Sequence, residues 1–405
     1  MPGRVFVLGA GASRHDTRDF KLPMPLSREF FLPSYLKEHW HELRFGSSFD
    51  RSQLGQLLTH YFGWANDEDF RVNIEDVYSF LEITGRVFSG NFWYRERLPT
   101  ARRQLLEYLA QLIFDISFHS RQPLLHLAIA KSLKPEDSII SFNWDLLLDN
   151  ALLKTRPGRR LLANQVALLD PFRHSSRVEH ADERAFDHLH RGYIIKMHGA
   201  VNLTVCISPD CIRRNAVARF DADDSGTGDH WTCEACGGPT ELLLVPPYFQ
   251  KSYLSDRFLR LQASIALQKM TMAEEIIVIG YSFPDFDFQA RAMMRASRFE
   301  LLGETDDQEA FLRRVVIVNP EVKDESYKAK VVDLFGVDRS VAAYGHEIDL
   351  DWYESVDDFL DKKLSAKARK EHGRTGRRPR SRVRPEGKVI LLKRDGVARQ
   401  PRRKR

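Results

Sequence analysis

A short apolar segment that runs directly into a turn of small residues is the feature that most constrains the fold of this chain. Residues 4–8 read Arg-Val-Phe-Val-Leu, and residues 9–13 read Gly-Ala-Gly-Ala-Ser. A near-continuous apolar strand suits a parallel sheet that is buried on both faces, and doubly wound α/β folds begin with a strand followed by a glycine-rich turn. We therefore predict that residues 4–8 form the first strand of such a sheet.

Further apolar segments extend the pattern, and a polar, glycine-bearing or asparagine-bearing turn follows each. They lie at residues 138–142, 193–197, 276–279 and 315–318. Between the first two predicted strands, apolar residues such as Ile74, Val77 and Leu81 recur at helical spacing, which predicts helices that face a core. The pattern as a whole predicts an α/β fold with a doubly wound, mostly parallel, Rossmann-like sheet and a helical insertion at residues 26–134.

All four cysteines lie in one short segment. Cys206 and Cys211 form a first pair, and after 21 residues Cys233 and Cys236 form a second, tighter pair. Two close pairs of thiolates match a tetrahedral zinc site, and four protein ligands leave no open position on the metal. We therefore predict a structural Zn²⁺ site in a small module at residues 203–240.

The charge of the chain is unevenly distributed. Residues 366–405 hold 17 Lys or Arg and 3 Asp or Glu, a net charge of +14. Since the whole chain carries +5, residues 1–365 carry −9. We predict one domain at residues 1–364 and a basic, unstructured tail at residues 365–405. A tail of this kind leaves nucleic acid open as a partner, beside the alternative of a solvated arm.

Two bulk features bear on location. We find no apolar run long enough for a membrane span, and the segment that precedes the first strand lacks the build of a signal peptide. The prediction is a cytoplasmic protein that does not enter a membrane.

The turn at residues 9–13 is the first candidate binding element. Gly9, Ala10, Gly11 and Ser13 would let the backbone approach a pyrophosphate, whose charge a following helix N-terminus would stabilise. The usual third glycine of a dinucleotide fingerprint is missing, and no acidic residue follows at the usual interval. The turn therefore favours nucleotide binding but disfavours an ordinary dehydrogenase, and a plain turn of small residues stays open as the alternative.

Two further strand ends carry groups suited to chemistry. Asn143 and Asp145 lie two residues apart, so on an extended strand end they would point the same way; the alternative for Asp145 is a helix N-cap. His198 precedes Gly199, and a histidine titrates near neutral pH, which suits general acid or base catalysis. A lone histidine is more often structural, and this one gains interest from its neighbours.

The last candidates follow the two late strands. Gly280 and Ser282 come after residues 276–279, and Asn319 comes after residues 315–318. They could contact the ribose or phosphate of a cofactor, and ordinary turn chemistry is the alternative for each.

Taken in this order, the elements resemble the sirtuin family. Sirtuins show a G-A-G-x-S loop, a T-Q-N-I-D strand end, a catalytic His-Gly pair, a four-cysteine zinc module, a G-T-S loop and a late Ile-Asn. The counterparts here are residues 9–13, 141–145 and 198–199, the four cysteines, and residues 280–282 and 318–319.

The resemblance implies a role for each candidate. Residues 9–13 would cradle the pyrophosphate of NAD, and Gly280, Ser282 and Asn319 would bind its adenosine half. Asn143 would hold the nicotinamide ribose and the attacking water.

In the same family, the aspartate at the strand end engages the nicotinamide carboxamide, which would be Asp145 here. The histidine of the His-Gly pair would be His198, acting as general base on the ribose hydroxyls.

The chain departs from protein-deacylating sirtuins in two places. Asp19-Phe20-Lys21 lacks the preceding G-I-P of those enzymes, and residues 243–248 lack the F-G-E that holds an acyl-lysine peptide. The chain is more similar to the sirtuin-like domains of bacterial anti-phage defence proteins, which share a long helical insertion and an S-F-N-W-D strand end. They also share a Pro-Pro pair with a nearby lysine, here Pro246, Pro247 and Lys251.

Several domains of that kind hydrolyse NAD. The predicted function is therefore an NAD glycohydrolase that releases nicotinamide and ADP-ribose, with NAD as its substrate and a role in antiviral defence. Two alternatives stay open: an NAD-dependent protein deacylase or ADP-ribosyltransferase, and a non-catalytic sensor of NAD or ADP-ribose with a nucleic-acid-binding tail. Relatives often assemble, which leaves a homo-oligomer open as well.

Overall fold

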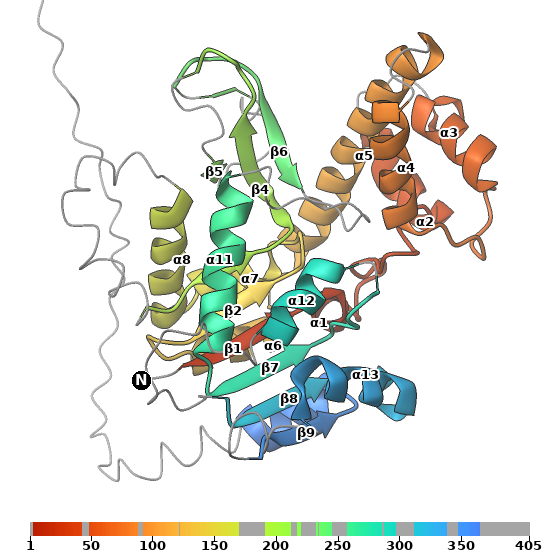
Figure 1. The fold of residues 1–405 in the computed structure, drawn as a ribbon. Coiled ribbons are helices and arrows are strands. Elements are labelled where there is room, and N and C mark those ends of the chain that lie inside the picture. Colours follow the sequence, from red (N-terminus) through yellow and green to blue (C-terminus); the bar gives the residue numbers. More distant parts are fainter. Residues whose placement is uncertain are drawn as a thin grey trace, which may run out of the picture.

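The computed structural model (Figure 1) describes most of the chain up to residue 364. The described residues are 3–42, 48–87, 92–120, 122–169, 191–211, 217–219, 232–233, 235–244, 257–285, 287–296, 312–337 and 347–364. The predicted tail at residues 365–405 and the segment with Pro246, Pro247 and Lys251 lie outside them.

A six-stranded parallel sheet organises the fold. Its strands are β1 (Arg4–Leu8), β2 (Ser138–Ser141), β3 (Ile194–Lys196), β7 (Glu275–Ile279), β8 (Arg314–Val318) and β9 (Asp349–Tyr353). They lie in the order β3-β2-β1-β7-β8-β9, and every neighbouring pair is parallel. Counted along the chain this is the order 3-2-1-4-5-6, in which the direction of winding reverses between β1 and β7. The predicted doubly wound, Rossmann-like sheet is confirmed.

Successive residues of each strand face opposite sides of the sheet and enter two separate apolar cores. In β1, Val5 and Val7 belong to one core, whereas Phe6 and Leu8 belong to the other, and all four are at most 2% exposed. The same alternation holds in β7 and β8. A strand with both faces buried needs apolar side chains at every position, which is why its sequence is continuously apolar.

Helices cover both faces of the sheet. The core around Phe6 and Leu8 is closed by helices that follow or precede the early strands and by one from the end of the described chain. These are α6 (Leu124–Ser132), α7 (Leu147–Leu153), α8 (Arg156–Leu169) and α15 (Val356–Phe359), which η6 (Leu360–Leu364) continues. The opposite core takes α11 (Arg257–Thr271), α12 (Phe288–Ala296) and α13 (Glu325–Phe335).

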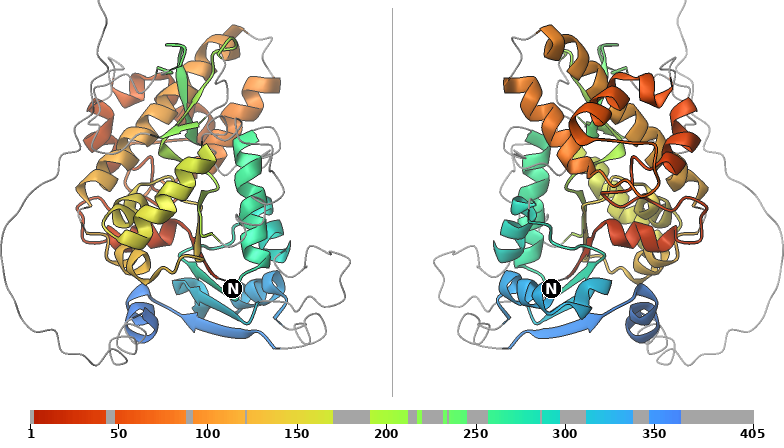
Figure 2. Two further views of the ribbon diagram at one scale, coloured as in Figure 1. Left: turned by 90° about the vertical axis from the view of Figure 1, so that its left-hand side faces the viewer. Right: turned by 90° about the vertical axis from the view of Figure 1, so that its right-hand side faces the viewer.

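A group of helices inside the predicted insertion at residues 26–134 lies between β1 and β2 in the chain. Its members are α2 (Pro33–His39), η1 (Trp40–Glu42), η2 (Phe49–Arg51), α3 (Gln53–Phe62), α4 (Ile74–Val87) and α5 (Phe92–His119). Figures 1 and 2 show α2–α5 standing together beyond the parallel sheet. Aromatic rings fill their interior, with Phe49 4.9 Å from Trp64 and 4.8 Å from Trp40 between ring centroids.

A second, three-stranded sheet projects from the fold beside this helical group (Figure 1). It contains β4 (Gly199–Cys206), β5 (Val217–Arg219) and β6 (Thr240–Leu244) in the order β5-β4-β6, all antiparallel. Arg102 of α5 donates to Glu241 of β6 at 2.5 Å and to Glu82 of α4 at 2.7 Å. This half-buried ion-pair group ties the second sheet to the helical group.

None of the helices in the described part of the chain is long and apolar enough to cross a membrane.

Candidate functional site

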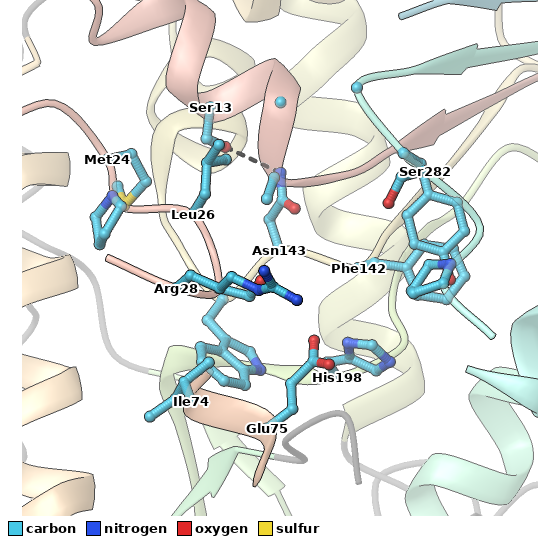
Figure 3. A pocket seen from close by; sticks show the side chains of 18 of the residues that line it. Ser13, Met24, Leu26, Arg28, Ile74, Glu75, Phe142, Asn143, His198 and Ser282 are labelled. Carbon is cyan, nitrogen blue, oxygen red and sulfur yellow. Dashed lines mark hydrogen bonds between the residues drawn. The ribbon is translucent and has the colours of Figure 1, made fainter. Parts of the chain in front are cut away.

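A cavity of about 580 Å³ opens where the winding of the parallel sheet reverses. It lies at the carboxyl ends of β1 and β7, and short segments after β2, β3 and β8 also line it. Figure 3 shows Ser13, Asn143, His198 and Ser282 around the same space. Open α/β sheets bind ligands at this reversal point, because the loops diverge there and leave a crevice.

The two loops at the reversal point are held together by their glycines. Gly9 follows β1 and starts helix α1 (Ala10–Asp16), and Gly11 N–H donates to Gly280 O at 2.9 Å. A Cβ on Gly9 would lie 2.5 Å from Gly280 O. Gly280 has φ +63°, and a Cβ there would lie 2.2 Å from the backbone nitrogen of Ala12. The glycines are therefore required by the contact between the loops, whatever else they bind.

Asn143 presents a defined face to the cavity. Its Nδ2 donates to Gly9 O at 2.8 Å and to Ser13 Oγ at 2.9 Å. A backbone carbonyl accepts only, so the amide orientation is fixed and both N–H groups are used. The carboxamide oxygen of Asn143 is the remaining polar atom, and Figure 3 shows it turned away from Ser13 toward the cavity. Asn143 therefore offers the cavity a hydrogen-bond acceptor.

Both carboxylate oxygens of Asp145 have partners within the protein. Oδ2 accepts from Ser13 Oγ at 2.6 Å, and Oδ1 accepts from Leu147 N–H at 3.0 Å at the start of α7. The N-cap of α7 is Leu146, one residue later than the alternative placed it, although Asp145 does bind the first N–H of the helix. Asp145 also ends a chain of hydrogen bonds from Asn143 through Ser13. The side chain lines the cavity and is 4% exposed.

His198 follows β3 and is buried against aromatic rings. Its Nε2 lies 3.6 Å from Asp287 Oδ2, and the same oxygen accepts from Tyr281 Oη at 2.5 Å. The Phe142 ring stacks on Tyr281 at 4.5 Å and meets the His198 ring edge-on at 5.2 Å. The imidazole is therefore held between a carboxylate and an aromatic wall at the edge of the cavity.

Beneath His198, a buried lysine joins its strand to the Asn143 loop. Lys196 is 1% exposed, pairs with Asp149 at 2.7 Å and donates to Asp145 O at 3.0 Å. A buried charge is tolerated only when it is paired and hydrogen-bonded. This pairing fixes the strand end that carries His198 against the loop that carries Asn143 and Asp145.

The late candidates differ in what they offer a ligand. Ser282 lines the cavity and is partly exposed. Asn319 holds the structure in place, since its Nδ2 donates to Tyr281 O at 3.2 Å and its Oδ1 accepts from Glu321 N–H at 3.0 Å. Burial raises the pKa of the Glu321 carboxyl, which lines the same wall, and Lys330 partly offsets this shift.

The loop that contains Ser282 is conformationally strained. Phe283 has φ +51° and is fully buried, with its ring 5.1 Å from Tyr281 and 6.1 Å from Phe335. A bulky side chain rarely adopts a positive φ, and such residues persist where the surrounding packing determines them. The packing of Phe283 therefore sets the backbone that presents Gly280 and Ser282 to the cavity.

Several lining residues were not among the candidates from the sequence. Arg28, from the segment before α2, and Glu75, from α4, point into the cavity from the side opposite the β1 loop (Figure 3). They lie together because Ile74 N–H donates to Ser27 O at 2.8 Å, and Asn73 Oδ1 caps α4 by accepting from Glu75 N–H at 3.0 Å. No spacing links these positions to the strand ends, so only the fold reveals them.

The four cysteines form a compact cluster outside the cavity. Their Sγ atoms lie within 4.8 Å of one another, and Cys206–Cys236 and Cys211–Cys233 are each 3.8 Å apart. A tetrahedral zinc ion with Zn–S bonds of about 2.3 Å separates its sulfurs by about 3.8 Å. The arrangement is compatible with the predicted zinc module.

Local geometry favours metal binding by the second pair. Gly237, with φ +68°, closes a turn in which its N–H donates to Cys233 O at 2.7 Å. Although burial raises the pKa of the Cys233 thiol, backbone N–H groups of Ala235 and Cys236 lower it overall, to about 7. A thiolate is the form that binds zinc.

The fold and the cavity define a parallel α/β protein with a ligand site at the reversal point of a 3-2-1-4-5-6 sheet. No protein-family model and no curated protein matches the sequence.

Solved structures of Sir2 proteins are similar to the chain. One is Sir2Tm bound to a propionylated peptide, with 13% identity and a TM-score of 0.36 over 90% of this chain and 93% of that one. Another is Sir2 with the inhibitor EX-527, 2′-O-acetyl-ADP-ribose and deacetylated p53 peptide, with 12% identity and a TM-score of 0.33 over 92% and 94%. A third is Sir2 with p53 peptide and NAD⁺, with 13% identity and a TM-score of 0.32 over 85% and 93%. Likeness this distant identifies neither a ligand nor an activity of this chain.

Proposed function

We propose that this protein is an NAD glycohydrolase, which cleaves the bond between nicotinamide and ribose and transfers the ADP-ribosyl group to water. The observation that carries the proposal is the fixed Asn143 amide. Gly9 O and Ser13 Oγ hold its two N–H groups, so its oxygen faces a cavity that His198 also lines. An acceptor and an imidazole beside one space can together orient and deprotonate a water molecule.

The shape of the site suits a dinucleotide. A pyrophosphate placed at the reversal point would meet the loop of residues 9–13, as in other dinucleotide-binding sheets. Ser282 and the Asn319 wall would then face the adenosine half, with Asn319 acting through the loop that it holds. Arg28 is the one Lys or Arg among the described lining residues, and it supplies positive charge for a phosphate.

The proposed reaction breaks the C1′–N bond and forms a C1′–O bond. The electron pair of the broken bond leaves with nicotinamide and neutralises its ring, while positive charge develops on the ribose. A water molecule donates one hydrogen bond to Asn143 Oδ1 and attacks C1′ with its oxygen. Its proton passes to His198, a transfer of the kind that contributes about 10²–10⁴-fold to rate.

Ser13 and Asp145 are assigned to positioning. The chain of hydrogen bonds Asn143–Ser13–Asp145 keeps the amide from rotating. Asp287 lies beside His198 Nε2 and would stabilise the imidazolium that forms when the ring takes the proton.

The test is release of nicotinamide and ADP-ribose from NAD by the purified zinc-loaded protein. His198→Ala and Asn143→Ala are expected to abolish release while circular dichroism stays unchanged. His60→Ala, an exposed histidine on α3, is the matched control and should keep full activity. Full activity in both site variants would overturn the assignment.

If the wild-type protein releases no nicotinamide, NAD binding should be measured. A rise in melting temperature with NAD, without products over hours, would favour the sensor or a gated enzyme over the hydrolase. NAD consumption that depends on an acetylated peptide would favour the deacylase. No binding of NAD at all would end the proposal.

The biological setting is part of the same proposal. An NAD hydrolase that acts in antiviral defence would be cytoplasmic and held inactive until triggered, and assembly of several copies is one way to trigger it. The basic tail at residues 365–405 would add nucleic acid as a partner. In that case the full chain should bind DNA or RNA with an affinity that falls as salt rises, and removal of the tail should abolish this binding.

A further inference from the structure

The indole of Trp144 holds a buried hydrogen-bond donor at the wall of the cavity. Trp144 lines the cavity and is 8% exposed, and its Nε1–H has no hydrogen-bond partner among the residues that the structure describes. A buried donor without a partner destabilises the folded state, so native proteins rarely keep one unless it serves a ligand or a water molecule. Trp144 therefore indicates that this wall takes a hydrogen-bond acceptor.

The surroundings of Trp144 suit a flat apolar ring. Phe30, Ile74 and Ile113 line the cavity with it, and all three are buried. The Phe30 and Trp144 rings are 6.3 Å apart between centroids and tilted by 58°. These side chains come from the segment before α2, from α4 and α5, and from the loop after β2, so the apolar part of the cavity lies where these elements meet.

A carboxylate borders the same part of the cavity. Glu75 follows Ile74 in the first turn of α4 and is 9% exposed. Asn73 Nδ2 lies 3.5 Å from Glu75 Oε2, and Figure 3 shows the carboxylate turned toward the cavity. A donor from Trp144 and an acceptor from Glu75, beside apolar walls, are the two contacts that an aromatic carboxamide needs.

Asp145 is poorly placed for the same task. Ser13 Oγ and Leu147 N–H already occupy its two oxygens at 2.6 and 3.0 Å. To receive a carboxamide N–H, Asp145 would have to share an oxygen that fixes either the Asn143 chain or the start of α7. Trp144 Nε1–H can donate a hydrogen bond to a ligand without losing an existing one.

We propose that Trp144 and Glu75 recognise the carboxamide of the nicotinamide ring and select NAD over its nicotinic acid analogue. This inference rests on the proposed function. Trp144 Nε1–H donates to the carboxamide oxygen, and Glu75 accepts from the carboxamide N–H₂ and attracts the cationic ring. A ligand carboxylate would offer no N–H to Glu75 and would place two negative charges together, which is a mechanism of rejection.

The experiment compares kcat/KM for NAD and for nicotinic acid adenine dinucleotide. The wild-type protein is expected to prefer NAD by about 10²-fold or more, since one lost hydrogen bond and a like-charge contact act together. Glu75→Gln is expected to reduce this preference about tenfold or more, because the amide side chain can donate to a carboxylate. Trp144→Phe keeps an aromatic ring and is expected to lower kcat/KM for NAD about tenfold.

Glu321→Gln is the matched control, since it removes another carboxyl from the lining of the same cavity. It is expected to leave the preference between the two dinucleotides unchanged. An equal effect of Glu75→Gln and Glu321→Gln would mean that overall charge sets the preference and would overturn the proposal. A wild-type preference for the acid form would do the same, because Arg28 would then be reading the ring substituent.

The two proposals can fail separately. NAD cleavage with an unchanged preference in Glu75→Gln and Trp144→Phe would remove the subsite and leave the hydrolase. If the wild type cleaves neither dinucleotide, calorimetric Kd values for both take the place of kcat/KM. A preference for NAD in binding that Glu75→Gln abolishes would keep the subsite and favour the sensor or a gated enzyme over the hydrolase, and binding of neither dinucleotide would refute both.

Discussion

Replacing Gly280 by alanine tests the contact between the two loops that form the site. Gly280 adopts φ +63°, and a Cβ there would lie 2.2 Å from the Ala12 nitrogen and 2.5 Å from the Gly11 carbonyl carbon. Gly63, at the end of α3, has a similar φ of +66°, but nothing lies within 4 Å of a Cβ on it. The two glycines therefore share a positive φ and differ in their surroundings.

The comparison separates two energies. An alanine in the left-handed region costs about 1–2 kcal/mol at either position. At Gly280 the new methyl group also collides with backbone atoms, which cannot rotate away, and overpacking of this kind adds about 1–3 kcal/mol. Gly280→Ala is thus expected to lower the free energy of unfolding by about 2–5 kcal/mol, and Gly63→Ala by about 1–2 kcal/mol.

Urea unfolding followed by circular dichroism measures both values, and NAD cleavage by the folded protein gives a second reading. Gly280→Ala should reduce cleavage even in the folded state, because relief of the collision moves the loop away from Gly9, whose carbonyl holds Asn143. Gly63→Ala should leave cleavage unchanged. Equal destabilisation by the two substitutions would refute the close approach of the loops.

Three further predictions concern stability. Purified protein is expected to contain one zinc ion bound by the four cysteines, and chelation should lower the unfolding midpoint; metal-free protein of unchanged stability would contradict the site. Asp137 pairs with Arg4 at 2.6 Å and is 1% exposed, so Asp137→Ala should cost about 3–5 kcal/mol in urea unfolding. Asp349→Ala breaks an exposed pair with Arg314 and should cost about 1 kcal/mol or less; similar losses would argue against the burial of Asp137. Burial lowers the pKa of Lys269 to about 8, so the folded state binds fewer protons than the unfolded state between that pH and the pKa of an unfolded lysine. Stability should therefore rise with pH across that window, and Lys269→Met should flatten the rise in a pH series of unfolding curves.

The interior of the sheet was readable from the sequence because its strands are buried on both faces. All five predicted strands are present, with ends shifted by at most one residue. The edge strand β9 was missed, since Asp349–Tyr353 is only partly buried and lacks the continuous apolar run of the inner strands. Strand β4 was missed because it begins directly at Gly199, after the His198 turn, and pairs with segments up to 45 residues away.

The candidate site was readable where its residues follow strands. The order of the strands could not be inferred from local pattern, yet it brings the turns after β1 and β7 together, and with them Gly11 and Gly280. Lining residues from the helical group could not be predicted from the sequence. Glu75, for example, reaches the cavity because the start of α4 is hydrogen-bonded to Ser27.

The sequence also could not distinguish residues that face a ligand from residues that hold the loops in place. Asn143 and Asp145 were predicted as a pair that faces one ligand. The structure divides their tasks, with one oxygen of Asn143 turned to the cavity and both oxygens of Asp145 committed within the protein.

The pairing of β1 with β7 also affects when the site can exist during synthesis. Arg4 pairs in register with Glu275, so one of the two neighbours of β1 is made only when synthesis reaches residue 275. The cavity further requires Asn319, which leaves the ribosome about 15–60 s after residue 13 at about 5–20 residues per second. A nascent or truncated chain therefore has no assembled site. The complete lining of this cavity therefore exists only after the segment around residue 319 has been made.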